Sequence, residues 1–548
     1  MIKIVKSVLF AALFSVLLFG KAAQAQTTIN AATCNSSDVQ AALNKVAADG
    51  TTVNIPAGTC TWTTTVSYNQ VFSTTILGAG NQSVVGGGDA TVIIDNVSHS
   101  PNDNPTLNLT AAPGKSLRLS GITMKSNGSS SQSFNGSITF YGTSNAVRID
   151  HAHLQLTADG KQMTIGGCVY GVMDHSIVDL NAGTTQNGVF LHQGNCGGDS
   201  LGVGDGQWHL PTSLGSANFF YFENDIFNGG TNLGGNGSTV APFVDDCSGG
   251  GRFVFRFNSI NGAQAQGHAT GHSNNPPDRS CRAYEIYMNT FGNSSVTNTS
   301  NPVEDAFYNT GGTGVVWGNT FTGYYKNIVE TNVDRTNSNT YVQAASPTGW
   351  GYCNGSSNWD GNQPGQNGWP CLDQIGRGEG DLLQGVFPTV CDASLTDCQN
   401  HIFSGRWPNQ ALEPVYQWMD KFQPAPSWGG LVWVSSTNVV PNRDYYLYTL
   451  AWNGSSFTGT AFNGTVGTGS GTLASRPSTC TAGVAYWATD QGSWNQSGTG
   501  GQGLLYKCSS ANTWTAYYTP YTYPHPLIKG SGSANNVAAP TSLTANVN

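Results

Sequence analysis

The chain has 548 residues, of which 10% are charged against roughly 25% in an average globular protein, and its formal net charge is -9. It contains no basic stretch of the kind that neutralises phosphates, so nucleic acid is excluded as the expected partner. With 70 glycines and many Asn, Ser and Thr residues, the surface should instead suit neutral hydrogen-bonding ligands.

The first 25 residues have the pattern of a secretory signal peptide. Lys3 and Lys6 precede an apolar run over residues 8–19, and the stretch AQA at 23–25 has the small-x-small form that signal peptidases cut. The apolar run is about half of the ~20 residues that a membrane-spanning helix requires. We therefore expect a secreted protein, extracellular or periplasmic, with no membrane insertion.

Twelve cysteines in an exported chain indicate disulfides, because extracytoplasmic compartments are oxidising and none of the cysteines has zinc-finger spacing. The simplest pairing joins neighbours in the sequence. It predicts the bridges Cys34–Cys60, Cys168–Cys196, Cys247–Cys281, Cys353–Cys371, Cys391–Cys398 and Cys480–Cys508.

One amphipathic helix is predicted, over residues 36–50, where Val39, Leu43 and Val46 recur at helical spacing and a Ser or Asp can cap the start. Residues 51–59, TTVNIPAGT, then indicate a strand and a turn. Everything downstream consists of short β runs separated by Gly, Asn and Ser, which predicts an all-β protein.

Five of these β runs resemble one another, and the last four recur at a spacing of about 30 residues. A repeat of this length with one short strand per unit predicts a parallel β-solenoid, which we place at residues 26–340. The runs are GVMDHSI, FYFENDIF, FVFRFNSI, YEIYMNTF and VVWGNTF, ending at Ile177, Phe227, Ile260, Phe291 and Phe321.

Aligning the runs on their last apolar residue predicts which side chains share a column. The position two before it should form a hydrogen-bonded ladder at a turn, and the position five before it should point into the solenoid. The ladder column holds His175, Asp225, Asn258, Asn289 and Asn319. The inward column holds Val172, Phe222, Phe255, Ile286 and Val316.

Because strand side chains alternate, the positions on either side of the inward column should point outward. We call the charged and aromatic members of these positions the outer strip: Glu223, Arg256, Glu285, Tyr221, Tyr287 and Trp317. The loop before Glu285 adds His268, Arg279 and Arg282. Aromatic faces stack on sugar rings and charged groups bond to hydroxyls, so the outer strip and this loop predict a carbohydrate-binding groove.

The opening DVQAALNKVAADGTTVNIPAGT at residues 38–59 and the stacked strands with a recurring Asn resemble the right-handed parallel β-helix superfamily of pectate lyases and polygalacturonases, over roughly residues 30–340. The resemblance implies a right-handed parallel β-helix with an N-terminal helix cap, and a polysaccharide as partner. Such folds carry lyases, hydrolases, adhesins and phage tailspikes, so the fold alone does not assign the chemistry.

The hydrolase motifs of that superfamily are met only in part. Glu223-Asn224-Asp225, Asp245-Asp246 and Gly267-His268-Ala269 resemble its Asn-Thr-Asp, Asp-Asp and Gly-His-Gly motifs in order, but no Arg-Ile-Lys follows. A hydrolase acting on a neutral glycan could also pair Glu285 with Asp245, Asp246 or Glu223 as its two carboxylates.

A pectate-lyase-like elimination would assign other roles to these residues. Arg256, Arg279 or Arg282 would neutralise the substrate carboxylate, and His268 or an arginine would take the proton. Asp245 and Asp246 would offer hard oxygen ligands to calcium, which is the one cofactor that the resemblance suggests.

Each candidate also has a purely structural interpretation. Glu223 and Arg256 would form a surface ion pair, and Asp245 and Asp246 would shape a turn before Cys247. His268 would bond within its loop, and Arg282 and Glu285 would pair with each other or with neighbours. A bridge from Cys247 to Cys281 would hold the Asp-Asp segment beside the loop that contains His268 and Arg279.

The last third, residues 341–548, is a Cys- and Trp-rich extension that should cover or extend the solenoid. Residues 413–422, EPVYQWMDKF, could add a further solenoid strand, and Cys480–Cys508 would close a small aromatic β unit. This unit is either a glycan-binding accessory module or a cap over the last rung.

The sequence thus predicts a secreted monomer that cleaves or binds a polysaccharide. A lyase or glycoside hydrolase is favoured, with a non-catalytic adhesin or a structural surface protein as alternatives. Clustered titratable groups within reach of one bond would favour the enzyme.

Overall fold

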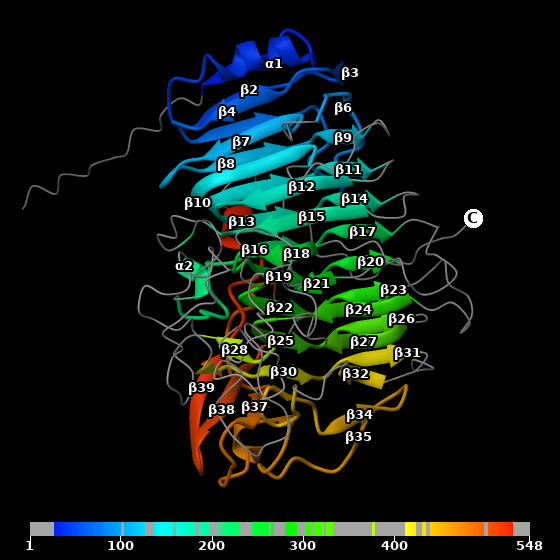
Figure 1. Ribbon diagram of the computed structural model, residues 1–548, viewed down its shortest axis with the longest axis vertical. Helices are drawn as coiled ribbons and strands as arrows, with labels where there is room; N and C mark the ends of the chain where they lie inside the picture. The colour runs from blue at the N-terminus through cyan, green and yellow to red at the C-terminus, as the bar shows by residue number, and fades with distance from the viewer. Residues whose placement is uncertain are drawn as a thin grey trace, which may run out of the picture.

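In the computed structural model the chain forms long parallel β-sheets in stacked order, consistent with a parallel β-helix solenoid (Figure 1). The structure describes residues 27–99, 104–126, 136–156, 160–180, 186–194, 196, 205–208, 210–229, 244–261, 265–267, 280–292, 303–309, 311–322, 325–331, 375–378, 411–423, 430–434, 439–497 and 502–529. The signal peptide predicted at residues 1–25 lies outside these ranges.

The strands run in three rows, of which row A carries the outer strip. Row A is formed by parallel strands in the order β1 (Thr28–Asn30), β2 (Thr51–Asn54), β5 (Thr74–Leu77), β8 (Leu117–Ser120), β10 (Ile138–Asp150), β13 (Cys168–Asp174), β16 (Phe220–Glu223), β19 (Arg252–Arg256), β22 (Ala283–Tyr287), β25 (Thr313–Trp317), β30 (Val415–Trp418) and β33 (Tyr445–Tyr446).

Row B is the 10-stranded sheet of β3 (Gly58–Trp62), β6 (Thr91–Asp95), β9 (Thr123–Ser126), β11 (His153–Leu156), β14 (Ile177–Leu180), β17 (Ile226–Gly229), β20 (Ser259–Asn261), β23 (Thr290–Gly292), β26 (Thr320–Thr322) and β31 (Lys421–Gln423). Row C holds β4 (Val66–Asn69), β7 (Leu107–Ala111), the first half of β10, β12 (Gly160–Gly166), β15 (Gln186–His192) and β18 (Val244–Ser248). A four-stranded sheet follows it: β21 (Ala265–Gly267), β24 (Val303–Asn309), β27 (Tyr325–Thr331) and β32 (Gly430–Val434).

The predicted helix is present as α1 (Ser36–Leu43) and lies at the N-terminal end of the stack (Figure 1). Val39, Ala42 and Leu43 are buried in the main hydrophobic core, and Val46 packs against that core although the helix has ended before it. Placing an apolar helix face on the first rung keeps the core side chains there out of water.

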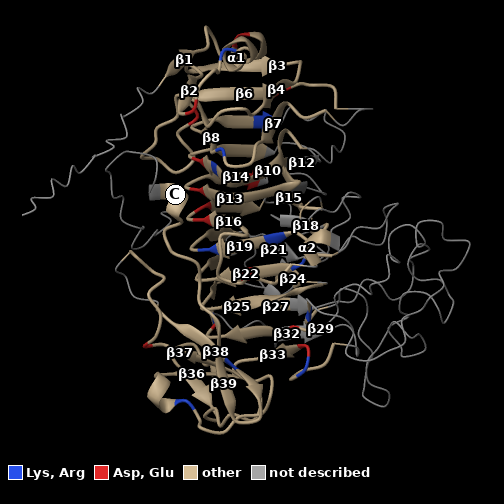
Figure 2. Cartoon of the chain, turned by 90° about the vertical axis from the view of Figure 1, so that its left-hand side faces the viewer, with Lys and Arg blue, Asp and Glu red and all other residues tan. Residues whose placement is uncertain are grey.

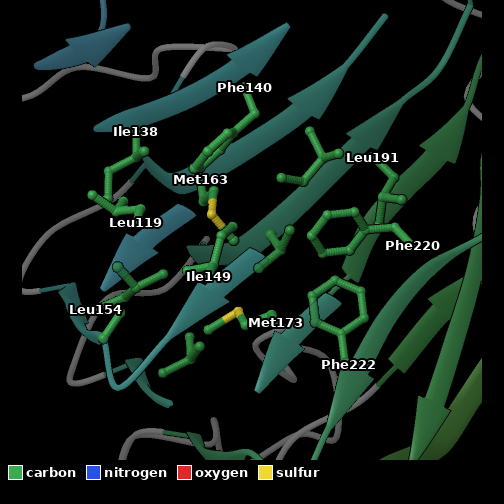
Figure 3. Packing of buried hydrophobic residues seen from close by; sticks show 14 of the residues in the cluster. Leu119, Ile138, Phe140, Ile149, Leu154, Met163, Met173, Leu191, Phe220 and Phe222 are labelled. Carbon is green, nitrogen blue, oxygen red and sulfur yellow. The ribbon is translucent and has the colours of Figure 1, made fainter. Parts of the chain in front are cut away.

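The interior of the solenoid is filled by alternate residues of each strand, as expected (Figure 3). Phe222, Phe255, Ile286 and Val316 are buried in this core and occupy one column. The prediction was wrong for Val172, since β13 pairs with β16 so that Met173 lies opposite Phe222 and takes the inward place. A slip of one residue moves a side chain to the opposite face of the sheet, and the alignment of the first run contained such a slip.

The predicted ladder of buried polar side chains is present. Backbone amides of Asp225, Asn258 and Asn289 donate to the side-chain oxygens of Asn258, Asn289 and Asn319 over 2.9, 3.0 and 3.1 Å. Asp420 continues the ladder by accepting from the amide of Asn319 at 2.8 Å. Each rung is thereby tied to the next by side chains as well as by strand pairing.

His175 is not part of this ladder, which corrects its predicted place. The neighbouring Ser176 donates its amide to Asp225 at 2.7 Å, so Ser176 is the ladder member. His175 occupies the turn position before it, at φ +52°, where the next rung has Asn224 at +60°. The same one-residue slip that misplaced Val172 explains this error.

Four predicted disulfides are confirmed: Cys34–Cys60, Cys168–Cys196, Cys247–Cys281 and Cys480–Cys508. The other two predicted bridges involve cysteines outside the described ranges. Four disulfides point to an oxidising, extracytoplasmic environment. Among the described residues, no helix has both the length and the apolar character needed to cross a membrane.

The segment at 413–422 continues the stack, as its sequence suggested. β30 pairs in parallel with β25, and β31 pairs in parallel with β26, so rows A and B both extend past residue 340. The chain then forms a hairpin of β34 (Leu450–Trp452) and β35 (Phe457–Gly459), and a small sheet of β36 (Thr468–Gly471), β37 (Ala485–Ala488), β38 (Leu504–Ser510) and β39 (Thr513–Tyr518). We call this small sheet the C-terminal sheet.

Replacing Asn289 with Ala should destabilise the fold by about 3 kcal/mol, because the buried amide of Asn258 and the carbonyl of Phe255 would each lose a hydrogen bond. Thr290→Ala, at the next and exposed position, is the matched control and should change stability by less than about 0.5 kcal/mol. Urea unfolding followed by tryptophan fluorescence measures both. Equal effects of the two substitutions would contradict a stabilising ladder.

Candidate functional site

The outer strip faces away from the solenoid interior, as predicted, but it does not form an open groove. Its six residues are 0–3% exposed, and three of them, Tyr221, Tyr287 and Trp317, belong to a second hydrophobic core outside row A. The prediction of a groove on this strip is therefore wrong. Alternation along a strand sets the face of a side chain, and says nothing about what later parts of the chain pack on that face.

The cover over the outer strip is the C-terminal aromatic region. Tyr287, Trp317 and Trp418 form a stack, with ring centroids 4.8 and 5.5 Å apart, and Trp487 and Trp494 of the cover pack on Trp317. In Figure 1 the C-terminal strands lie at the end of the stack and the red end of the chain runs back along it. The aromatic unit thus packs on the side of the last rungs of row A.

Glu223 and Arg256 form an ion pair, but it is buried and not on the surface as predicted. Arg256 Nε donates to Glu223 Oε2 at 2.8 Å, and both side chains are 0% exposed. The guanidinium also donates to the carbonyls of Tyr521 and Thr522 and to the hydroxyl of Tyr287. This pair joins the outer strip to the end of the chain.

Glu285 and Arg282 do not pair with each other. The two carboxylate oxygens of Glu285 accept from the amide of Gly215 at 2.6 Å and from the hydroxyl of Tyr518 at 2.8 Å. Arg282 is fully buried and donates to Glu413 at 2.8 Å. Both residues therefore hold covering segments in place, which argues against the catalytic roles expected for them.

The remaining predicted site residues are only partly described. His268 and Arg279 lie outside the described ranges. Asp245 and Asp246 are in β18, which belongs to row C, whereas Glu285 is in row A. The side chains of Asp245 and Asp246 are outside the described part of the structure, so calcium binding by them stays a prediction. Among the described residues, no three His, Cys, Asp or Glu side chains lie close enough together to form a metal site.

The charged part of the outer strip continues along row A toward the N-terminal rungs. Asp150, Asp174, Glu223 and Arg256 follow one another in register on consecutive strands, with Arg118 and Arg148 in the adjacent column. We call these six residues the charged column. Figure 2 shows the acidic and basic positions along this side of the stack, from β8 to β19.

The carboxylates of the charged column are held by arginines one rung away. Arg118 donates from Nε to Asp150 at 2.7 Å, and Arg148 donates from Nε and Nη2 to Asp174 at 2.8 and 2.9 Å. Three carboxylates one strand spacing apart would repel one another strongly without these partners. Burial raises the pKa of Glu223 above its usual value, and Arg256 opposes that rise.

Two histidines lie next to these carboxylates. Nδ1 of His151 is 2.8 Å from Asp150 Oδ2, and Nδ1 of His175 is 2.9 Å from Asp174 Oδ2. The two rings are nearly parallel, with centroids 5.6 Å apart. A carboxylate only accepts, so Nδ1 carries a proton and Nε2 is the ring nitrogen left for a ligand.

The neighbouring charges shift the pKa of His175 and that of Asp150. Burial opposes the charged form of His175, but the Asp174 carboxylate outweighs it and raises the pKa of His175 above the ordinary 6.5. Burial would also raise the pKa of Asp150, but hydrogen bonds from Arg118 and His151 hold it well below its usual range. The side chain of His175 is 25% exposed, so it can meet a ligand from solvent.

A glycine-rich loop at 78–89 positions both histidines from outside. The amide of Gly86 donates to the carbonyl of His175 at 2.9 Å, and a Cβ on Gly87 would lie 2.4 Å from the carbonyl of His151. The loop also supplies Gln82, which accepts from Arg118 at 2.9 Å. Only glycine permits so close an approach at the φ of +70° that Gly87 adopts.

Sequence reasoning placed His175 in the ladder column and did not consider His151, although a signal for both histidines exists. The stretches VRIDHAHL and YGVMDHSI each contain Asp-His, 24 residues apart, at equivalent places of adjacent units. The repeat comparison began at the second of these units and was one residue out of register there. A comparison that included the unit of Asp150 would have aligned the two Asp-His pairs.

Glu285→Gln should make stability less dependent on pH. Burial raises the pKa of Glu285 from 4.5 to about 7, so the folded protein binds a proton that the unfolded chain releases, and stability falls as pH rises from 4.5 through 7. Glutamine carries no charge; its Oε1 can accept from the Gly215 amide, and its NH2 group can donate to the Tyr518 oxygen. The substitution should therefore raise stability at pH 8 relative to pH 4 by about 3 kcal/mol.

Urea unfolding at several pH values tests this expectation, with Asp490→Asn as the control for loss of one exposed carboxyl. The control should leave the shape of the curve unchanged. A Glu285→Gln curve that runs parallel to the wild-type curve would contradict the inferred protonation of Glu285.

Comparisons with models of known protein families, with curated proteins and with solved structures find no match to this chain.

Proposed function

We propose that the protein is an exported polysaccharide lyase on a right-handed parallel β-helix of the pectate lyase-like kind. The observation that carries the proposal is the repeated Asp-His pair, Asp150-His151 and Asp174-His175, on consecutive strands with nearly parallel rings. An imidazole oriented by a carboxylate is a common acid–base group near neutral pH. The charged column would supply the remaining binding groups.

Elimination fits these residues better than hydrolysis does. A glycoside hydrolase needs two carboxyl groups that reach the scissile bond from opposite sides. Asp150, Asp174 and Glu223 are 0% exposed and each is bonded to an arginine, so none is placed to approach a glycan. The histidines, in contrast, keep one ring nitrogen for the substrate.

In the proposed reaction, Nε2 of a neutral imidazole takes the proton from C5 of a uronate residue. The electrons of the broken C5–H bond form the C4–C5 double bond as the C4–O4 bond breaks, and a protonated imidazole gives a proton to the departing O4. Arg118, whose side chain is 23% exposed, would offset the charge of the substrate carboxylate. This cation matters because the whole chain carries a net charge of -9.

The partner in this proposal is a polysaccharide, and the protein acts as a secreted monomer. A non-catalytic adhesin remains the alternative, because the partly exposed Arg118 and His175 would also bind a glycan without turnover. The two functions differ in whether the Asp-His pairs move protons, and hence in the products.

The purified mature protein should be incubated with uronate-containing and neutral polysaccharides, with and without calcium, while ultraviolet absorbance and reducing ends are recorded together. A lyase produces unsaturated products, so both signals should rise on a uronate polymer. Reducing ends alone would indicate a hydrolase. Binding to one polymer without either signal would establish the adhesin.

His175→Asn should lower the lyase rate at least 100-fold, because general acid–base groups contribute about that much. Asparagine is chosen because it tolerates the positive φ at this position. The matched control is His153→Asn, since His153 lies 2.7 Å from both Asp89 and Asp179 but is in row B. Equal losses in the two variants, with both proteins folded, would rule out a catalytic role for His175.

A further inference from the structure

The end of the described chain runs back along the outer face of row A. We call residues 518–529 the strap. Beginning at the end of β39, it meets Glu285 of β22, then Arg256 of β19, and then Glu223 of β16. Its last turn, α4 (Pro526–Lys529), packs against β13 and β10, which carry the two Asp-His pairs. Figure 1 shows this red segment and its short helix beside β13 and β16.

The strap contacts the polar groups of the strip one after another. The hydroxyl of Tyr523 donates to Asn224 at 2.9 Å, and the amide of His525 donates to Glu223 at 3.1 Å. The carbonyls of Tyr521 and Thr522 accept from Arg256 at 2.7 and 2.9 Å. A hydroxyl donating to an amide oxygen, an N–H donating to a carboxylate and carbonyls accepting from a guanidinium are contacts that sugar hydroxyls, as donors and acceptors, can also make.

Aromatic rings complete this resemblance to a bound saccharide. The ring of Tyr221 lies 4.8 Å from that of His525 and 5.6 Å from that of Tyr521. Without the strap, Tyr221 would present a ring face beside Glu223 and Arg256. A ring face beside charged hydrogen-bonding groups is a typical arrangement in carbohydrate sites.

The strap is held by side-chain packing and hydrogen bonds, with the ring of Tyr523 stacked on that of Phe257 at 3.9 Å between centroids, and hardly at all by strand pairing. In the described part of the chain, the strap beyond Tyr518 forms one isolated β-bridge, between Tyr523 and Asn495. No β-bridge in that part joins the strap to row A. Residues 518–529 contain no cysteine, so no disulfide is formed by the strap itself. Prolines at 520, 524 and 526 remove amide donors that a further ladder would need.

We infer that the strap is an autoinhibitory segment, which occupies part of the glycan-binding surface and must be displaced before a long polysaccharide can bind along row A. This inference rests on the proposed function of the charged column. Displacement would join the partly exposed groups at one end of the column, Arg118 and the neighbouring His175, to the covered pair Glu223 and Arg256. The site would then span the strands from β8 to β19.

The test is cleavage of the strap after folding. A protease recognition sequence placed between Thr519 and Pro520 allows the full chain to fold before the segment from residue 520 is cut off and removed. The matched control carries the same sequence in the exposed turn at Gly454, between β34 and β35. Binding and turnover of the polymer panel are measured before and after cleavage in both proteins.

Cleavage after Thr519 should raise the apparent affinity for the polymer, or the turnover, at least tenfold. If the strap leaves the site open in less than a tenth of the molecules, the apparent affinity is at least tenfold weaker than that of the open site. A synthetic peptide of residues 520–529 should restore the inhibition, and the control cut should change nothing. Unchanged activity with the strap gone would overturn the inference, as would loss of the folded circular dichroism spectrum. Failure of both cut and uncut protein to bind any polymer would overturn the proposed function as well.

Discussion

The buried amide ladder fixes the register of the rungs, and the outer face of row A depends on that register. The side-chain oxygens of Asn258, Asn289 and Asn319 each accept the amide of the preceding rung, so a strand cannot slide without leaving buried groups unpaired. A slip of one residue would turn Glu223 or Arg256 into the apolar core beside Phe222. The ladder therefore keeps charged side chains on one face and in one column.

The same register divides the outer face into two regions. From β8 to β19 the column is charged, and each carboxylate meets an arginine of a neighbouring rung. From β22 to β30 the column is aromatic, with Tyr287, Trp317 and Trp418 stacked upon one another. The charged region can meet water at partly exposed groups such as His175, but the stacked rings need a cover. The C-terminal sheet provides that cover.

The features that the sequence predicts correctly are local or periodic. Strand alternation identified the core column of Phe222, Phe255 and Ile286, and pairing each cysteine with its neighbour in the sequence identified four disulfides. The cover on Glu285 and Arg256 could not be predicted, because its contacts join residues more than 230 apart and leave no periodic signal. The Asp-His pairs were within reach of sequence reasoning, and a one-residue alignment error concealed them.

The two halves of the C-terminal cover differ in how firmly they are attached, and the groups beneath them explain the difference. The sheet braced by Cys480–Cys508 lies on stacked rings, whose exposure to water would be unfavourable at all times. The strap lies on the rings of Tyr221 and Phe257 and on Glu223 and Arg256, which remain paired with each other when uncovered and would gain hydration. Removing the strap therefore leaves no unpaired buried charge behind. Displacing a cover costs less free energy over the charged column than over the stacked aromatic rings. The strap, which has no disulfide, covers part of the charged column.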